Sequence, residues 1–284
     1  MADARPGPSV RARVRVIEDG ADGRRDVIRR DDVATEEPLE IRLSAGPARR
    51  TVAVTMRTPG HDFELVAGYL LAEGVITAAD DLVRVDYCTD MDVTAEQQYN
   101  VVTAALRSPV MPEPDTLDRH GYTSSACGVC GKSSIDALEV RCAPVSVDCV
   151  LDVETLYALP DRLRAAQGVF ARTGGLHAAG LASLNGDVLV AREDVGRHNA
   201  VDKVFGHTLL HASVPVGAGV LMVSGRTSFE IVQKAVAAAV PIVAGVSAPS
   251  SLAVSLADRL GVTLVGFLRG RKANVYTHSD RIRA

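Results

Sequence analysis

The chain of 284 residues contains no tryptophan, and aromatic residues make up only 4% of it, although 47% of its residues are hydrophobic. A core of this composition has to be built from Val, Leu, Ile and Ala. Such a core suits layered α/β packing better than an aromatic-rich β-sandwich. The length predicts one large domain or two ordinary ones.

Other features are absent as well. No apolar run approaches the roughly 20 residues of a membrane span. Arg5, Arg11 and Arg13 are not followed by the apolar stretch of a secretory signal. A net charge of −4 argues against general nucleic-acid binding. The five cysteines are an odd number in a long chain, so we expect free thiols and a reducing cytoplasm rather than a disulfide framework.

The hydrophobic pattern divides the chain into three segments. Residues 1–40 are polar, with one strand expected at Val10–Val16. Residues 41–166 are predicted to form a smaller mixed α+β domain, and residues 167–284 a three-layer α/β domain. The elements expected in the second segment are strands at Ile41–Leu43, Thr51–Arg57, Asp81–Cys88 and Gln98–Leu106, and helices at Phe63–Leu71, Ser133–Val140 and Asp152–Ala166.

The third segment has the clearest pattern. Asn185-Gly186 joins two strand-like runs, Leu176–Ser183 and Asp187–Arg192, which is a strong hairpin signal. Helices and short apolar strands then alternate, which favours parallel strand pairing. The expected elements are helix 197–211, strand Gly219–Val223, helix Phe229–Ala239, strand Pro241–Val246, helix Leu252–Leu260, strand Val262–Phe267 and a basic loop Leu268–Lys272.

The most informative motif is the cysteine pair in Cys127-Gly128-Val129-Cys130-Gly131. Its glycines predict an exposed loop, and Lys132 favours the nucleophilic thiolate. A zinc site, a thioredoxin-like dithiol and a mobile sulfur carrier remain open. The zinc site lacks a well-spaced second half, since Cys142, Cys149 and His120 are scattered. A redox dithiol would normally open a long helix after a strand, whereas a proline-rich loop precedes this pair.

Three loops follow strands of the third segment, at the sheet edge where α/β proteins bind ligands. They are Ser224–Ser228, Ser247–Ser251 and the basic loop Leu268–Lys272. Two of them lead into helix N-termini, which attract anions, and their arginines and lysine favour an anionic ligand such as a nucleotide or pyrophosphate. Serines before helices are also ordinary caps. Neither a Walker A motif nor G-x-G-x-x-G is present.

The polar run Arg192–Asn199 also follows a strand, and it has two interpretations. In one, the run is structural, with Asp194 as the cap of a helix whose first turn is solvated. In the other, the run is functional, and His198 and the carboxylates line the ligand cleft at the strand ends. Ordinary structural roles are expected for the remaining thiols and for several basic residues. These are Cys88, Cys142 and Cys149 as buried thiols, His177 as a core histidine, and His61, Lys203, His207 and His211 on helix starts or faces.

Together these motifs resemble the formate dehydrogenase accessory sulfurtransferase family, FdhD/NarQ. The runs that carry the resemblance are Thr58–Leu65, Gly68-Tyr69-Leu70, Glu73-Gly74, Ser125–Gly131, Arg172–His177, Arg192–Lys203, Ser224-Gly225-Arg226 and Ser247–Ser251. The resemblance implies a cytoplasmic sulfur carrier that accepts sulfur from a cysteine desulfurase as a persulfide on Cys127. Cys130 would relay or resolve the sulfur, or only keep Cys127 reactive. The acceptor would be the molybdenum or tungsten bis(molybdopterin guanine dinucleotide) cofactor, before its insertion into formate dehydrogenase.

The resemblance also implies where that cofactor binds and how the chain assembles. The implied contacts are Phe267, Leu268, Arg269, Gly270, Arg271 and Lys272, with Ser224, Gly225, Arg226 and His198 as further candidates, and no metal held by the protein itself. It implies a homodimer and a cytidine-deaminase-like third segment. The deaminase zinc signature is absent, because the two helix starts carry no cysteine pair. The alternative is a non-catalytic chaperone for the cofactor, in which the cysteine pair is a structural or docking element.

Overall fold

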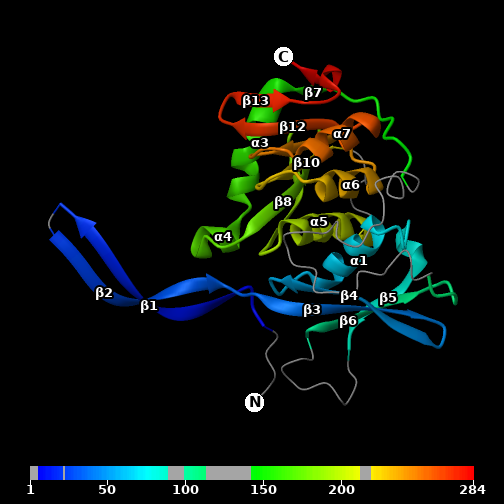
Figure 1. Cartoon of the computed structure of the whole chain (residues 1–284), viewed down its shortest axis with the longest axis horizontal. Coiled ribbons are helices and arrows are strands. Elements are labelled where there is room, and N and C mark those ends of the chain that lie inside the picture. The colour runs from blue at the N-terminus through cyan, green and yellow to red at the C-terminus, as the bar shows by residue number, and fades with distance from the viewer. Residues whose placement is uncertain (1–5, 22, 89–98, 113–141, 212–218) are drawn as a thin grey trace.

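The structure, a computed structural model, describes residues 6–21, 23–88, 99–112, 142–211 and 219–284. The motif around Cys127 and Cys130 and the helix expected at Ser133–Val140 lie outside the described residues. Within them, a four-stranded sheet and a six-stranded sheet are joined by a layer of helices, and a two-stranded hairpin projects from this body (Figure 1).

The hairpin corrects one expectation. A single strand was predicted in the polar segment, but β1 (Ser9–Gly20) and β2 (Gly23–Ala34) pair as antiparallel strands of twelve residues each. The sequence of β2 is dominated by charges and lacks a regular apolar alternation, so its strand was missed. Ion pairs across the hairpin replace apolar packing, as where Arg15 Nε donates to Asp26 Oδ1 at 2.8 Å.

The four-stranded sheet contains the strands predicted for the second segment. Its order is β4-β3-β6-β5, formed by β3 (Glu37–Ala45), β4 (Ala48–Arg57), β5 (Leu82–Tyr87) and β6 (Val101–Leu106). β3 and β4 form a hairpin, and β3 pairs with β6 in parallel. Helix α1 (Asp62–Ala72) packs against this sheet and ends before Gly74, where φ is +70°.

The six-stranded sheet is mixed rather than purely parallel. Its order is β13-β12-β11-β10-β8-β9, formed by β8 (His177–Ala182), β9 (Val188–Asp194), β10 (Val220–Val223), β11 (Ile242–Gly245), β12 (Thr263–Arg269) and β13 (Lys272–Val275). The predicted parallel pairs β10–β11 and β11–β12 are present, whereas β8 runs antiparallel to β10. The expected basic loop is a tight turn between antiparallel strands, because β12 and β13 form a hairpin.

Helices cover both faces of this sheet, as the three-layer prediction requires. α5 (Arg197–His211), α6 (Phe229–Ala237) and α7 (Ser251–Arg259) lie on one side, and α3 (Val153–Ala165) lies on the other (Figure 1). The short elements are α4 (Gly168–Thr173), β7 (Leu151–Asp152), β14 (Ile282–Arg283), and the 3-10 turns η1 (Ala79–Asp81) and η3 (Ser279–Arg281). α3 packs on the six-stranded sheet although it precedes residue 167. The domain boundaries stay a prediction.

The two sheets share one core through the crossing of α1 and α5. A Cβ on Gly68 would lie 1.9 Å from the carbonyl oxygen of Asp202, and a Cβ on Gly206 would lie 1.7 Å from that of Glu64. The two helix backbones are therefore in direct contact, and only glycine fits at these positions. Helices of the described part are all too short or too polar to span a membrane.

Candidate functional site

The strand ends of the six-stranded sheet converge as the sequence predicted. Where β10 ends, Ser224 Oγ accepts a hydrogen bond from the backbone N–H of Ala178 at 2.9 Å, which fixes the loop beside the start of β8. Thr227 N–H donates to the carbonyl of Ala248 at 3.2 Å, so the loops after β10 and β11 are joined by backbone pairing. Gly225 lies against the ring of His177, where a Cβ would be 3.4 Å from Nδ1.

Cationic groups gather at this edge. Burial lowers the pKa of His177 below its ordinary value; the Arg197 charge adds to this, Asp194 opposes it, and Arg226 contributes a smaller further lowering. Burial also lowers the pKa of Arg197, and the charge of Arg226 adds to that effect. The cations of this edge therefore destabilise one another, and a bound anion would relieve the repulsion.

His198 lies at the same edge of the sheet and makes polar contacts from the first turn of α5. Its Nε2 is 3.0 Å from Ser228 Oγ and 3.0 Å from Glu230 Oε2, both at the start of α6. Two polar atoms of this edge, Glu230 Oε1 and Thr227 Oγ1, are buried and have no hydrogen-bond partner among the described residues. Buried polar atoms are normally paired, so this edge can accept a further polar group.

The residues predicted to bind the cofactor around the basic turn, 267–272, differ in their exposure and in their partners. Phe267 is 41% exposed and adopts φ of +51°, with its N–H bonded to the carbonyl of Ser247. Arg269 Nε donates to the carbonyl of Val246 at 3.2 Å, which keeps it near the strand ends. Arg271 instead pairs with Glu154 of α3. Leu268 is fully buried in the core, backbone included, so it exposes no surface to a ligand in this structure.

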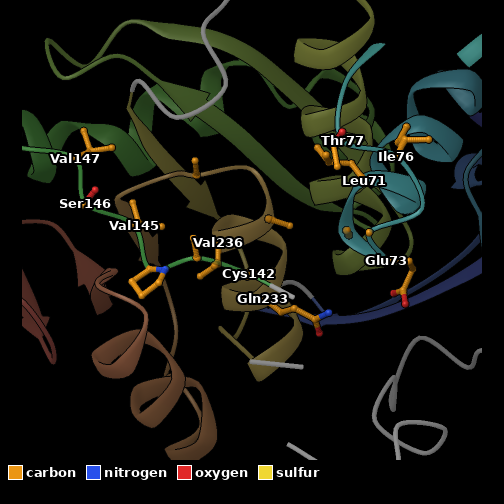
Figure 2. A pocket seen from close by; sticks show the side chains of 16 residues that line it. Leu71, Glu73, Ile76, Thr77, Cys142, Val145, Ser146, Val147, Gln233 and Val236 are labelled. Carbon is orange, nitrogen blue, oxygen red and sulfur yellow. The ribbon is translucent and has the colours of Figure 1, made fainter. Parts of the chain in front are cut away.

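The three thiols outside the motif, Cys88, Cys142 and Cys149, lie within the described residues and are free. Cys88 and Cys149 are buried as expected, and burial raises the pKa of the Cys149 thiol. Cys142 is only partly buried, which corrects its expected burial. It lines a cavity of about 400 Å³ between the end of α1, the start of the segment 142–147 and α6 (Figure 2). The cavity wall is mostly apolar, with Leu71, Val145 and Val236 among its residues.

A second cavity, of about 480 Å³, lies at the base of the hairpin. Its wall includes Thr58-Pro59-Gly60-His61, part of α4 and the end of β9. Lys203, expected on an ordinary helix face, reaches this cavity but is 99% buried and pairs with Asp194 at 2.7 Å. Its Nζ also donates to the carbonyl of Thr58 at 2.8 Å. Through these two contacts Lys203 of α5 joins the end of β9 to the turn before α1.

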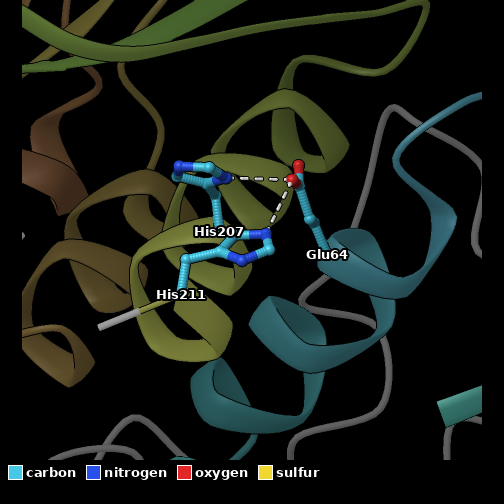
Figure 3. Close-up of side chains that lie close together, drawn as sticks. All are labelled: Glu64, His207 and His211. Atoms are coloured by element: carbon cyan, nitrogen blue, oxygen red, sulfur yellow. Dashed lines mark hydrogen bonds and ion pairs between the residues drawn. The ribbon is translucent and has the colours of Figure 1, made fainter. Parts of the chain in front are cut away.

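Three histidines that were expected to be ordinary gather around Glu64 of α1. His207 Nδ1 lies 3.0 Å and His211 Nε2 lies 3.7 Å from Glu64 Oε1 (Figure 3), and His61 Nδ1 lies 3.2 Å from Oε2. Arg192 binds both carboxylate oxygens, at 2.5 and 2.8 Å. Burial alone would raise the pKa of Glu64, but these hydrogen bonds outweigh it and hold the pKa well below its usual range.

The spacing of His207 and His211, one helical turn apart, is typical of metal ligands. However, Arg192 Nη2 lies 2.9 Å from His207 Nδ1 and covers the carboxylate that a metal would need. The cluster in this arrangement is an ion-pair network that ties α1 to β9 and α5. Glu64 precedes Arg192 by 128 residues and His207 by more, and no sequence signal could have placed these segments together.

The comparisons with known proteins agree on one family. The family model described as "FdhD/NarQ family" matches residues 34–283. A sulfur carrier protein FdhD of Mycobacterium tuberculosis is 53% identical over 90% of this chain and 93% of its own length, and one of Streptomyces avermitilis is 51% identical over 96% and 95%. A crystal structure from Desulfotalea psychrophila, provisionally assigned as a formate dehydrogenase accessory protein, superposes with a TM-score of 0.73 at 26% identity. It covers 97% of this chain and 99% of that one.

Proposed function

The chain belongs to the FdhD/NarQ family, and from that premise we propose that it is a sulfur carrier required for formate dehydrogenase activity. Sulfur would arrive from a cysteine desulfurase as a persulfide on Cys127. It would leave to the molybdenum bis(molybdopterin guanine dinucleotide) cofactor, which is the substrate of the transfer. The observation that carries the substrate proposal is the cation-rich edge of the six-stranded sheet, where Arg197 and Arg226 lie beside His177.

The proposed chemistry uses one thiolate. The Cys127 thiolate attacks the outer sulfur of the desulfurase persulfide, and the desulfurase thiolate is the leaving group, so no external oxidant is needed. Lys132, five residues along the chain, favours the thiolate form. Cys130 would relay the sulfur or keep Cys127 reactive.

The strand-end edge is suited to the guanosine phosphates of this substrate. Phosphate oxygens pair well with the guanidinium group of an arginine, which can donate two hydrogen bonds. Arg226 and Arg269 lie at this edge, and the start of α6 adds its N-terminal dipole. The two unpaired buried oxygens of this edge offer further contacts to the ligand or to water held with it. The exposed ring of Phe267 can pack against a guanine base.

The same premise supports the remaining proposals on location, partners and fold. We place the protein in the cytoplasm, with a cysteine desulfurase and the catalytic subunit of formate dehydrogenase as partners, and as a homodimer. The third segment is proposed to be cytidine-deaminase-like, since a hairpin is followed by alternating helices and strands. Its helix starts carry His198 and Arg226 where a zinc deaminase would carry metal ligands.

The sulfur-carrier proposal is tested by intact-mass analysis after incubation with a cysteine desulfurase and L-cysteine. Wild-type protein is expected to gain one sulfur, about 32 Da, which a reductant removes. Cys127→Ala should lose the gain entirely and should also fail to restore formate dehydrogenase activity in a deletion strain. Cys142→Ala, a thiol outside the motif, is the matched control and should keep both.

An alternative function is a non-catalytic chaperone that only holds the cofactor. It predicts that no variant gains sulfur although the cofactor still binds. Full formate dehydrogenase activity with Cys127→Ala would likewise contradict the carrier proposal.

Cofactor binding at the strand-end edge is tested with GDP as the probe, by calorimetry. Arg226→Ala should weaken GDP binding about tenfold or more, because a hydrogen bond to a charged group contributes about 1.5–3 kcal/mol. The loss should shrink at high salt, where the ionic attraction is screened. Arg84→Ala removes the same charge from the four-stranded sheet, where the side chain pairs with Asp86, and should leave GDP affinity unchanged. Equal affinities for all three proteins would move the site elsewhere.

A further inference from the structure

The β1–β2 hairpin is the least supported part of the described structure. It forms a separate two-stranded sheet that leaves the body of the molecule (Figure 1), and isolated two-stranded hairpins are marginally stable in water. It also exposes apolar side chains: Ile17 is 57% and Ile28 is 60% exposed. Helix α4 contacts β2, but among the described strands β2 pairs only with β1. Its outer edge is therefore a template for pairing with another strand.

Charges within the hairpin are only partly compensated. Asp26 is paired with Arg15, and Arg24 with Asp19. Asp32 Oδ1 lies 3.7 Å from Arg11 Nε across the hairpin. Within the described residues, the other charges of β2 form no ion pair or side-chain hydrogen bond; these are Arg25, Arg29, Arg30 and Asp31. Arg30 lies directly opposite Arg13 in the strand register, and like charges in that position are destabilising.

In β2, several residues at equal distances before and after Ile28 carry opposite charges. Residues before Ile28 read Arg24-Arg25-Asp26, and residues after it read Arg30-Asp31-Asp32, so basic and acidic positions exchange across the centre. If β2 pairs antiparallel with a second β2 in a register centred on Ile28, the opposed charges are Arg24 with Asp32, Arg25 with Asp31, and Asp26 with Arg30, while Arg29 faces Val27. Two-fold symmetry forms each of these pairs twice.

We infer that the free edge of β2 pairs with β2 of a second copy of this chain. The two hairpins form a continuous four-stranded sheet, β1-β2-β2-β1, with a two-fold axis at Ile28. The two residues of each opposed pair point to the same face of the sheet as each other, as antiparallel pairing requires. Arg25, Arg30 and Asp31 gain the partners that their own hairpin does not supply, and Ile28 packs against Ile28.

The complementary register belongs to β2 and not to β1. In β1 the basic residues Arg11, Arg13 and Arg15 alternate along the first half, and the acidic residues Glu18 and Asp19 lie only at the tip. Pairing β1 with itself brings arginines together or leaves them unmatched. The family model begins at residue 34, the last residue of β2, so this interface is an addition to what that model recognises.

This inference deepens the proposed homodimer by giving it an interface, and it does not depend on the sulfur chemistry. The test is sedimentation equilibrium of the full chain, with two single charge reversals. In Arg25→Asp, the new aspartate faces Asp31 of the second copy, and in Asp31→Arg, the new arginine faces Arg25 of the second copy. Because like charges then oppose one another, the dimer dissociation constant of each variant alone should be at least threefold higher than that of wild type. Mixing the two variants restores opposite charges at both positions, and the mixture should form a heterodimer of wild-type strength.

A second pair of variants separates the interface from the stability of the hairpin. Ile28→Glu places two carboxylates on the axis while facing Arg15 within its own hairpin, so it should weaken self-association. Ile17→Lys is the matched control, because it faces Asp26 and lies away from the β2 edge, and it should associate like wild type. If the charge-reversal variants and Ile28→Glu dimerise like wild type, the β2–β2 interface is wrong but the proposed homodimer stands. If wild-type protein is monomeric, both the interface and the homodimer are wrong. Neither result bears on persulfide formation, which is measured separately.

Discussion

Gly68→Ala is expected to destabilise the protein by about 3 kcal/mol or more, and to abolish the folded state where the margin is small. The added Cβ would lie 1.9 Å from the carbonyl oxygen of Asp202 and 2.6 Å from its carbonyl carbon. Both are backbone atoms, so no rotamer change can relieve the clash. α1 and α5 would have to separate, which opens a gap in the core that both sheets share. In an exposed helix the same substitution would instead stabilise by about 1 kcal/mol.

Urea unfolding of the purified variant gives this free energy from the midpoint. Gly168→Ala is the matched control, since a Cβ at that helical position meets no atom within 4 Å, and its stability should match or slightly exceed that of wild type. A Gly68→Ala variant as stable as Gly168→Ala would contradict the backbone contact between the helices.

Lys203→Met is expected to cost about 3–5 kcal/mol, because it leaves the carboxylate of Asp194 buried without its counter-charge. Lys203 and Asp194 are 99% and 100% buried. Asp194 also accepts hydrogen bonds from the backbone N–H groups of Thr58 and Gly196, at 3.1 and 2.8 Å. These contacts hold the charge in place but do not neutralise it.

A double-mutant cycle separates the lost ion pair from lost packing. Asp194→Asn alone leaves the lysine charge unpaired, whereas Asp194→Asn combined with Lys203→Met removes both charges. The double variant should therefore be more stable than the sum of the single losses predicts, by at least 1 kcal/mol. Additive losses, or a cost below about 1 kcal/mol for Lys203→Met, would show that the pair contributes no net stability.

Local sequence signals predicted most of the third segment. The helix Arg197–His211 was expected at the residues where α5 forms, and Asn185-Gly186 correctly marked the β8–β9 hairpin. Periodicity and turn chemistry act over a few residues, so they suffice for such elements. They could not set the direction of β8 relative to β10, because that pairing depends on which strand edge is free after the chain folds.

Side-chain placement was harder to predict than secondary structure. Lys203 was expected on a helix face and is buried, because its charge partner comes from the end of β9. His61, His207 and His211 meet at Glu64 only because α1 crosses α5 at two glycines. By contrast, the convergence of the loops after β10 and β11 was predicted correctly, since every α/β sheet presents loops at its strand ends; the assignment of a ligand to Ser224 and Arg226 stays a prediction. Leu268 is buried because it continues β12 into the core, and its predicted contact with the cofactor stays a prediction.

The glycine crossing also has a mechanical consequence. With no side-chain layer between the backbones of α1 and α5, the two helices can neither slide nor roll past one another without collision. The four-stranded and six-stranded sheets must then translate and rotate together, as one rigid body. Any change of shape that accompanies the proposed sulfur loading cannot be a hinge between the sheets. It has to be taken up by segments that leave this rigid unit, of which the β1–β2 hairpin is the longest one described.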